Sequence, residues 1–355
     1  MKILHAISSS DDGAVQRAFE QTVTALARTD HAQRVVIPKD ERLAMRLRSV
    51  GLESLELPFR ARFDFSSKRR LNNEISAFDA DLVLSWTPEV SNDVTPAHGG
   101  RGQAKHLGVV GEAFASSQYE SCDHLLTFSQ QRVDRVISAG WPPEKVTKLP
   151  PIIVSDGIKP HDRKMFFTPA TAKLVVVVGN LTTGQGFQML MEAIGRISGI
   201  YVWIVGEGPD KKKLDDQALE IGIKPRTRFL GAQSDIMPLI AAADIVISPA
   251  TKDDVGEQVL RAWGCGKAVI AADAIGPGLL VRHRETGVLV PVEDARSLAE
   301  AIKWVNQDSD FSSRIAVAGA EEFAKSHSEA VVIPKYEALF QTIVTSRADP
   351  APSDQ

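Results

Sequence analysis

The stretch of sequence that decides the fold is Lys173–Val178, KLVVVV. An uninterrupted apolar, β-branched run of this kind is typical of a strand buried on both faces of a parallel sheet. A helical pattern follows, with apolar residues at i, i+3, i+4 and i+7: Phe187, Leu190, Met191 and Ile194. A buried strand followed by an amphipathic helix is the first part of a βαβ unit.

The same alternation extends along the chain in both directions from this stretch. In the first half we predict strands at Lys2–Ile7, Arg34–Pro38, Leu82–Ser85, Leu107–Val110, Leu125–Phe128 and Val146–Leu149. In the second half we predict further strands at Tyr201–Val205, Arg228–Leu230, Ile245–Ser248, Ala268–Ala271 and Val288–Val290. Helical patterns lie between and after them, including Ala14–Ala27, Gln130–Ser138, Ala295–Val305, Ser312–Lys325 and Glu329–Thr345. Because such alternation favours parallel sheets, we predict an α/β protein with two Rossmann-like domains.

A proline-rich stretch separates the two halves. Residues 151–171 contain Pro151, Pro160, Pro169 and Gly157, which is the composition of a linker. We therefore predict an N-terminal domain over residues 1–150 and a C-terminal domain over 172–327. Residues 328–346 are expected to form a helix that packs back on the first domain, and 347–355 a disordered tail.

Composition and charge exclude several classes of protein. The chain has 355 residues and a formal net charge of −4, so it lacks the basic surplus of a nucleic-acid-binding protein. The two cysteines, Cys122 and Cys265, lie far apart in sequence and indicate neither a metal site nor a disulfide framework. With no secretory signal or membrane-spanning stretch in the sequence, we expect a cytoplasmic protein with no metal and no cofactor.

A series of short motifs in the second half carries a family resemblance. The motifs occur in this order: VVGNLTTGQGFQMLMEAI from Val177, Tyr201–Pro209 (YVWIVGEGP), Arg228–Gly231 (RFLG), Ala243–Pro249 (ADIVISP), Gly264–Val269 (GCGKAV) and Thr286–Pro291 (TGVLVP). In order and spacing they resemble family 4 (group 1) of the retaining glycosyltransferases, over roughly residues 174–302. That resemblance implies a GT-B architecture, with two Rossmann-like domains facing each other across a cleft.

A narrower resemblance points to a subgroup of that family. The segment Tyr119–Ser129, the Gly140–Pro142 turn and Trp263 are similar to bacterial members that build lipopolysaccharide core or related surface glycans. The resemblance implies transfer of a sugar from a nucleotide-sugar donor to a surface-glycan or lipid-linked acceptor, with retention and without a metal.

The implied donor site departs from the family pattern where the diphosphate should bind. The family has an Arg and a Lys in the loop after the first strand of the second domain, and Asn180 and Gln185 stand there in this chain. Both side chains can donate hydrogen bonds but carry no charge. Because charge-assisted bonds contribute about 1.5–3 kcal/mol and neutral ones about 1, the double change lowers the expected affinity for a diphosphate by one to three decades.

The family's two glutamates, with seven residues between them, correspond to the ends of residues 253–261, DDVGEQVLR. Asp253 stands for the first and is expected to hold a sugar hydroxyl, with backbone donors at Val255 and Gly256. Arg261 replaces the second glutamate and, lacking any acceptor, cannot bind a ribose diol. It is expected either to hold an anion or to pair with Glu257, an i, i+4 spacing that favours the pair.

Four further residues complete the predicted site. Gly13 follows Asp12 at the place of the family's first Gly-Gly turn, and Gly206 stands in the family's Gly-x-Gly-Pro turn. Both are expected at the donor. His106 and Glu112 flank a predicted strand end, where the family presents polar groups to the acceptor. For these two, a structural histidine and a solvated glutamate are an equally good interpretation.

Residues Pro58–Arg70, PFRARFDFSSKRR, combine five basic residues with three phenylalanines. The composition suits peripheral contact with an anionic membrane at its inner face or with a lipid-linked acceptor. A solvated loop with a few inward phenylalanines is the competing interpretation, and Asp64 favours it.

Three functions remain open at this point. The resemblance favours a glycosyltransferase. The changes at Asn180, Gln185 and Arg261 raise the alternative of a non-catalytic relative that acts as a binding or partner subunit. An epimerase on the same architecture fits the order of the motifs less well.

Overall fold

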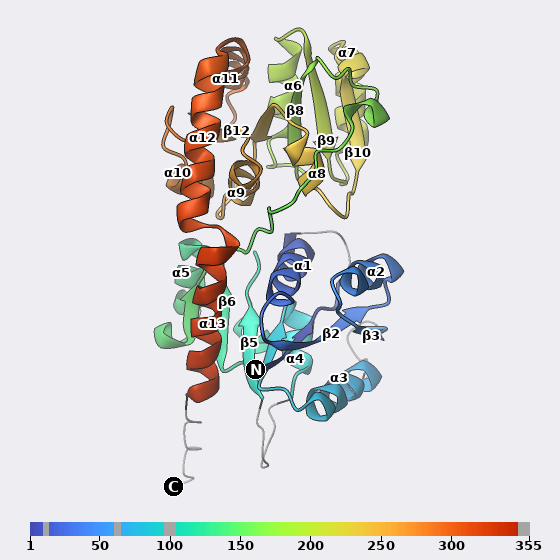
Figure 1. The fold of residues 1–355 in the computed structure, drawn as a ribbon, viewed down its shortest axis with the longest axis vertical. Helices are drawn as coiled ribbons and strands as arrows, with labels where there is room; N and C mark the ends of the chain where they lie inside the picture. Colours follow the sequence, from blue (N-terminus) through green and yellow to red (C-terminus); the bar gives the residue numbers. More distant parts are fainter. Residues whose placement is uncertain (10–13, 60–64, 96–103, 347–355) are drawn as a thin grey trace. The chain divides into compact units, whose positions relative to one another are not determined.

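The computed structural model describes residues 1–9, 14–59, 65–95 and 104–346, and the chain divides into two compact units (Figure 1). Unit 1 contains Met1–Ile152 and the described residues from Val332 onward, and unit 2 contains Ile153–Val331. The predicted tail 347–355 lies outside the described residues.

Unit 1 is built on a parallel sheet, with strand order β3-β2-β1-β4-β5-β6-β7 among the described residues. Its strands are β1 Lys2–Ala6, β2 Ala32–Pro38, β3 Ser54–Leu57, β4 Leu82–Ser85, β5 Lys105–Val109, β6 His124–Thr127 and β7 Val146–Lys148. Its helices are α1 Ala14–Leu26, α2 Glu41–Ser49, α3 Phe65–Phe78, α4 Pro88–Asp93, α5 Gln130–Ser138 and, from Val332 on, α13 Glu329–Thr345, with short 3-10 turns η1 Ser116–Gln118 and η2 Pro143–Lys145. The edge strand β3 was not expected, because its sequence SLEL is short and only half-buried.

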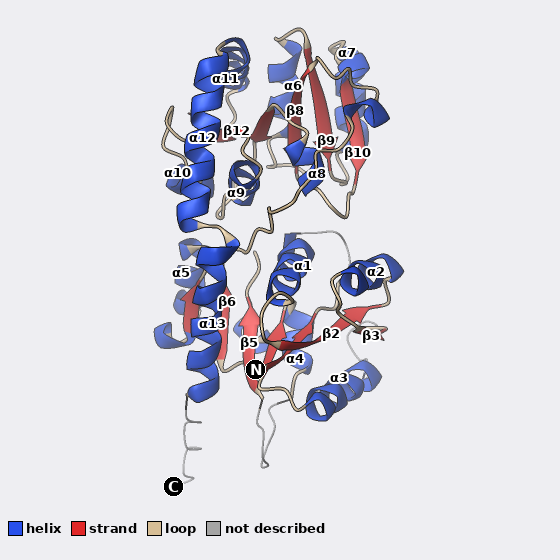
Figure 2. Ribbon diagram, viewed as in Figure 1, coloured by secondary structure: helices blue, strands red, loops and turns tan. Residues whose placement is uncertain are grey.

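Unit 2 repeats this architecture, with strand order β10-β9-β8-β11-β12-β13 and parallel pairing throughout. Its strands are β8 Lys173–Val178, β9 Ile200–Val205, β10 Thr227–Gly231, β11 Ile245–Ser248, β12 Ala268–Ala272 and β13 Val288–Val290. Its helices are α6 Phe187–Gly195, α7 Lys211–Glu220, α8 Met237–Ala241, α9 Glu257–Gly264, α10 Ile275–Leu280, α11 Ala295–Gln307 and α12 Ser309–Ser326, with 3-10 turns η3 Arg163–Phe166 and η4 Lys224–Arg226. Helices cover both faces of the sheet (Figure 2).

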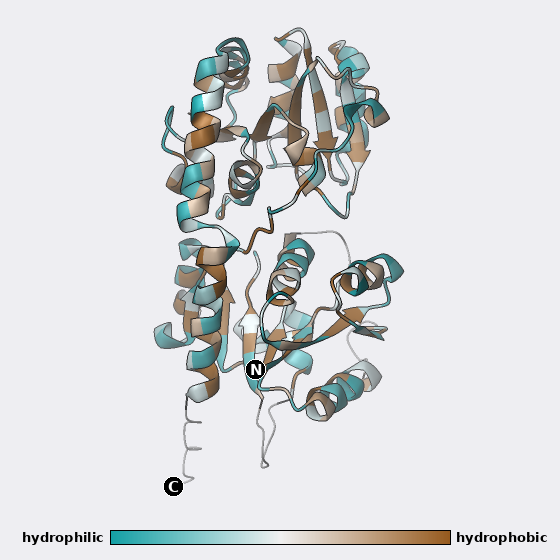
Figure 3. Ribbon diagram, viewed as in Figure 1, coloured by the Kyte–Doolittle hydropathy of each residue, from teal (hydrophilic) through white to brown (hydrophobic). Residues whose placement is uncertain are grey.

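The sequence KLVVVV is apolar throughout because successive side chains enter two different cores. Val175 and Val177 pack with α6, α7 and α11, whereas Leu174, Val176 and Val178 pack with α8 and α9 on the opposite face. Figure 3 shows the strands as largely hydrophobic. The two-layered burial confirms the prediction of a parallel α/β sheet covered on both sides.

We predicted residues 151–171 as a linker, and of these residues 153–171 lie in unit 2. Ile153 is fully buried in the core beside α8 and α9, and Phe166 packs edge-on against Trp203 at 5.1 Å between ring centroids. Prolines stop regular structure but do not prevent side chains from packing, so a segment of linker composition can still contribute to a core.

In unit 1, α13 contributes fully buried side chains, among them Val332, Tyr336 and Phe340. The Tyr336 hydroxyl donates a hydrogen bond to the Pro150 carbonyl at 3.0 Å. The Tyr336 ring is therefore removed from water while its hydroxyl keeps a hydrogen-bond partner.

Candidate functional site

The candidate site in unit 2 lies where the strand order reverses. Strand β8 lies between β9 and β11, so the chain leaves the carboxyl ends of β8 and β11 toward opposite faces of the sheet. In open parallel sheets this switch point is where ligands bind. The loops that flank it are residues 179–186 after β8 and 249–256 after β11.

These two loops are in direct contact. The Thr251 hydroxyl donates to the Gly184 carbonyl at 2.9 Å. Gly186 has φ +73°, and a Cβ there would lie 1.9 Å from the Pro249 carbonyl oxygen. Only glycine fits this approach, which places the first turn of α6 directly beside the end of β11.

Asn180 and Gln185 lie in the loop after β8, at its carboxyl end. Asn180 is exposed, and its carbonyl accepts a hydrogen bond from the Thr182 amide at 2.9 Å. The Gln185 side chain folds back over the strand end, with Oε1 3.8 Å from the position of a Cβ on Gly179. The switch point therefore carries two neutral amide side chains next to the N-terminus of α6.

Asp253 lies in the second loop, just before α9, and its side chain bonds to the backbone of that loop. Its Oδ1 accepts hydrogen bonds from the amides of Val255 at 2.9 Å and Gly256 at 2.7 Å. The backbone donors that we predicted for a ligand at these two residues are therefore already engaged by Asp253. Burial raises the pKa of the Asp253 carboxyl, and the two amide hydrogen bonds oppose that rise.

Arg261 forms the predicted pair with Glu257 along α9, with Nη2 2.5 Å from Oε1. Its side chain is only 2% exposed. Because this guanidinium is buried within unit 2, the interpretation as an ion pair with Glu257 holds. Arg261 does not present a cation to a ligand.

Gly206 has a structural role that differs from the predicted donor contact. Its amide donates to the Gly231 carbonyl at 2.8 Å and is therefore not available to a ligand. Its φ is +140°, and a Cβ there would lie 1.9 Å from the Gly179 carbonyl oxygen. Gly206 lets the loop after β9 pass close to the loop after β8.

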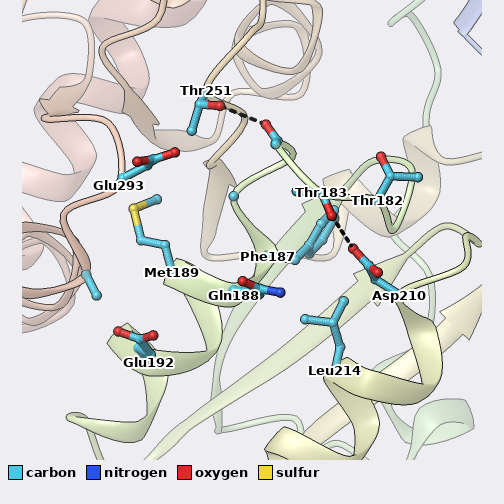
Figure 4. Close-up of a pocket in the computed structure, with 13 residues that line it drawn as sticks. Thr182, Thr183, Phe187, Gln188, Met189, Glu192, Asp210, Leu214, Thr251 and Glu293 are labelled. Carbon is cyan, nitrogen blue, oxygen red and sulfur yellow. Dashed lines mark hydrogen bonds between the residues drawn. The ribbon is translucent and has the colours of Figure 1, made fainter.

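A pocket of about 330 Å³ adjoins the switch point (Figure 4). It shares Gly184, Gly186 and Thr251 with the two loops, and carboxylates line it at Glu192, Asp210 and Glu293. The lining contains no Lys, Arg or His. Its remaining polar side chains are Thr182, Thr183 and Gln188. Carboxylates repel a diphosphate but accept hydrogen bonds from hydroxyl groups, so the pocket suits a neutral polyol better than an anion.

In unit 1, His106 and Glu112 do not form one cluster. His106 lies near the start of β5 and is 3% exposed, while Glu112 lies beyond the opposite end of the strand and is exposed. The His106 ring bonds to Ser85 Oγ at 2.7 Å through Nε2 and to the Ser121 carbonyl at 3.1 Å through Nδ1. The carbonyl acceptor assigns the proton to Nδ1. Burial lowers the pKa of His106 to about 4. Of the two interpretations that the sequence left open, the burial and the hydrogen bonds favour the structural histidine.

The polar residues at the switch point of unit 1, between β1 and β4, were not predicted from the sequence. Ser8 Oγ lies 2.7 Å from Thr87 Oγ1 and donates to Glu89 Oε2 at 3.3 Å. These residues follow two strands that become neighbours only through the strand order. Gly13, predicted for the same edge, lies outside the described residues.

The described residues offer neither a metal-binding cluster nor a membrane-spanning helix. Among the described residues, no group of three or more His, Cys, Asp or Glu side chains is arranged to hold a metal ion. In the same part of the chain, no helix is long and apolar enough to cross a membrane.

Residues 159–322 match the family model described as glycosyl transferases group 1. The chain is 27% identical to the lipopolysaccharide core biosynthesis glycosyltransferase LpsE of Rhizobium meliloti (strain 1021), over 95% of this chain and 98% of LpsE. It is also 27% identical to LpsD of the same organism, over 98% and 100% of the two chains. These matches confirm the resemblance seen in the motifs.

Solved structures confirm the fold. Anabaena Alr3699/HepE in complex with UDP and glucose superposes with a TM-score of 0.81 at 18% identity, over 96% of this chain and all of that one. WaaG, a glycosyltransferase involved in lipopolysaccharide biosynthesis, gives 0.68 at 16% identity, over 96% and 99%. At these identities the likeness supports the two-domain architecture alone.

Proposed function

We propose that the chain moves a sugar from a nucleotide-sugar donor to a surface-glycan or lipid-linked acceptor, since residues 159–322 match the family model of glycosyl transferases group 1. The acceptor we propose is of the lipopolysaccharide type, the transfer retains configuration, and no metal takes part. The observation that carries the proposal is the match of nearly the whole chain to two lipopolysaccharide core glycosyltransferases.

We propose that the donor binds at the switch point of unit 2. Asn180, Gln185 and the N-terminus of α6 would donate hydrogen bonds to the diphosphate as its negative charge grows on bond cleavage. The Asp253 oxygen Oδ2 makes no hydrogen bond within the described residues, so it would accept one from a sugar hydroxyl. HepE, of similar fold, has been solved with UDP-glucose, which supports a nucleotide-sugar.

Neutral diphosphate contacts have a physical consequence. With amide side chains in place of cations, the charge of the donor is offset mainly by backbone dipoles. These fixed dipoles depend less on mobile ions than an exposed cation does. The proposal therefore includes a donor affinity that is weak for the family and changes little with salt.

The acceptor would bind in unit 1, at Glu112 and the switch-point residues Ser8, Thr87 and Glu89. For a lipid-linked acceptor we propose peripheral membrane contact through Pro58–Arg70. In the described part of that segment, Phe65 is 75% exposed, and the basic residues Arg69 and Arg70 are exposed beside it on α3. The reaction would take place in the cytoplasm, a reducing compartment that suits the free thiols of Cys122 and Cys265.

The test is a calorimetric binding screen of the purified chain against UDP-, GDP- and ADP-sugars at millimolar concentration. Micromolar to submillimolar binding of one donor would support the proposal. Turnover with a lipopolysaccharide-core acceptor, measured with a chelator present, then tests metal independence, and the anomeric proton coupling of the product tests retention. If no donor binds, the enzyme proposal fails and a non-catalytic partner subunit becomes the better interpretation.

A further inference from the structure

The turn Arg163–Phe167 of unit 2 presents two large apolar side chains to solvent. Met165 is 67% and Phe167 is 80% exposed, while Phe166 between them points into the unit. The turn is the short green segment beside β10 in Figure 1. Phe167 also has φ +51° and ψ +38°, a left-handed conformation that is uncommon for a bulky residue and stores strain.

The turn is not a loose loop, because two guanidinium groups attach it to the rest of unit 2 by hydrogen bonds. Arg163 donates to the Ala242 carbonyl at 2.6 and 3.0 Å and to the Ala172 carbonyl at 2.9 Å. Arg228, on β10, donates to the carbonyls of Phe166 at 2.9 Å and Phe167 at 3.1 Å. The main chain on both sides of Phe167 is therefore fixed to the sheet.

Side-chain packing adds a third attachment. The Phe166 ring lies 4.9 Å from the His161 ring and 5.1 Å from the Trp203 ring, centroid to centroid. The Trp203 indole N–H donates to the hydroxyl of buried Thr168 at 2.9 Å. With the residues before and after Phe167 anchored, the structure maintains the strained conformation that keeps Met165 and Phe167 in solvent.

Two exposed lysines lie close in sequence to the two apolar side chains. Lys159 and Lys164 are exposed beside the turn, and Arg228 lies under it. Two acids lie on the same segment or against it, and Asp162 is exposed. Asp244 pairs with Arg163 at 3.2 Å, and Asp162 accepts a hydrogen bond from the Lys164 amide at 3.0 Å.

From this arrangement we propose that the turn Arg163–Phe167 is a lipid anchor, which inserts Met165 and Phe167 into the interface of an anionic membrane while Lys159 and Lys164 contact the headgroups. Two protruding side chains cover a few hundred Å² at most, well below the roughly 800 Å² per partner of a stable protein interface. Apolar tips flanked by cations are the chemistry of an interfacial anchor. The inference is independent of the proposed donor and of the surface on α3.

The experiment is co-sedimentation of the full chain with vesicles of phosphatidylcholine alone and vesicles rich in phosphatidylglycerol. The test variant carries Met165→Ser and Phe167→Gly. Glycine adopts φ +51° without strain, so this variant should keep or raise the thermal midpoint. The control carries Leu219→Ser and Val317→Ser, which remove two other exposed apolar side chains, 70% and 57% exposed in wild type.

Wild type should partition onto the phosphatidylglycerol vesicles more than onto phosphatidylcholine, and added salt should weaken the binding. The test variant should lose about tenfold or more, since burial of one such side chain corresponds to roughly that factor. Lys164→Glu should lose several-fold, and the control should bind as wild type.

Three results would overturn the proposal. The first is equal partitioning of wild type and the test variant, or no partitioning at all. The second is loss of binding on Phe65→Ser combined with unchanged binding of the test variant, which would assign the lipid contact to α3 and not to the turn. The third is a dimeric wild type that the test variant converts to a monomer, which would show that a second copy of the chain covers the turn.

Discussion

At Asp253 one carboxylate has two tasks. It accepts hydrogen bonds from the Val255 and Gly256 amides in the loop before α9, and in our proposal its second oxygen holds a sugar hydroxyl. The two tasks can be separated by mutation, because an asparagine side chain can accept the same two amide hydrogen bonds, whereas only the carboxylate supplies the charge.

We therefore expect Asp253→Asn to lower kcat/KM by about a hundredfold or more, the scale of a lost charged contact in a transition state, with a nearly unchanged thermal midpoint. Asp253→Ala should lose the same activity and also about 1 kcal/mol of stability, since it removes two hydrogen bonds that hold the loop before α9. Steady-state kinetics and thermal unfolding of both variants measure the difference. Wild-type turnover by Asp253→Asn would remove Asp253 from the donor site.

His106 gives unit 1 a defined response to acid. Burial lowers its pKa from 6.5 to about 4, so between those values the unfolded chain binds a proton that the folded chain excludes. Stability then rises with pH across this window and is lost as the pH falls from about 6.5 toward 4. His5, with its pKa lowered to about 3, acts in the same direction.

We expect His106→Gln to flatten the pH dependence of the unfolding free energy between about pH 4 and 6.5, by the equivalent of a few kcal/mol across the window. Glutamine can keep one of the hydrogen bonds but does not titrate. Urea unfolding at a series of pH values measures the slope. A slope equal to that of wild type would show that His106 already titrates normally in the folded chain.

At the scale of elements, the donor edge of unit 2 depends on close approaches between loops. The loop after β9 crosses the loop after β8 at Gly206, and α6 approaches β11 at Gly186. These contacts form between segments that follow different strands, and they bring Asn180 and Gln185 to one edge.

Gly206→Ala should therefore destabilise unit 2 by several kcal/mol and weaken donor binding, because its Cβ would overlap the Gly179 carbonyl. The matched control is Gly199→Ala, which also has positive φ but no atom within 4 Å of its Cβ. The control should lose only about 1 kcal/mol, the cost of the backbone conformation. Chemical denaturation with donor titration compares the two. Equal losses would mean that the close contact at Gly206 contributes nothing.

At the scale of the whole molecule, the described residues of each unit form hydrophobic clusters of their own. Domains with independent cores commonly unfold in separate steps. A ligand that binds one of them stabilises that one.

We expect calorimetry to show two overlapping unfolding transitions, and a nucleotide donor at saturating concentration to raise the midpoint of only one of them. Limited proteolysis during the melt identifies which unit is protected, and the proposal requires unit 2. A single two-state transition that shifts as a whole would show that donor binding involves both units.

Several features follow from local sequence. The uninterrupted apolar run KLVVVV and the helical period of the α6 pattern predicted the parallel α/β architecture. Both signals depend only on near neighbours along the chain. The Glu257–Arg261 pair was predictable for the same reason, because four residues span one helical turn. The six motifs in series gave the family.

The sequence by itself thus determined most of the strands and helices, the resemblance to the glycosyl transferases group 1 family and the residue types at the proposed donor edge. Only the tertiary structure decided how those residues are used: that Asp253 consumes the Val255 and Gly256 amides, that Gly206 serves packing, and that His106 is buried away from Glu112. It also ordered residues 153–171 and exposed Met165 and Phe167. Each of these depends on atoms brought together from distant parts of the chain, and the burial and hydrogen bonds that result have no signature in local periodicity.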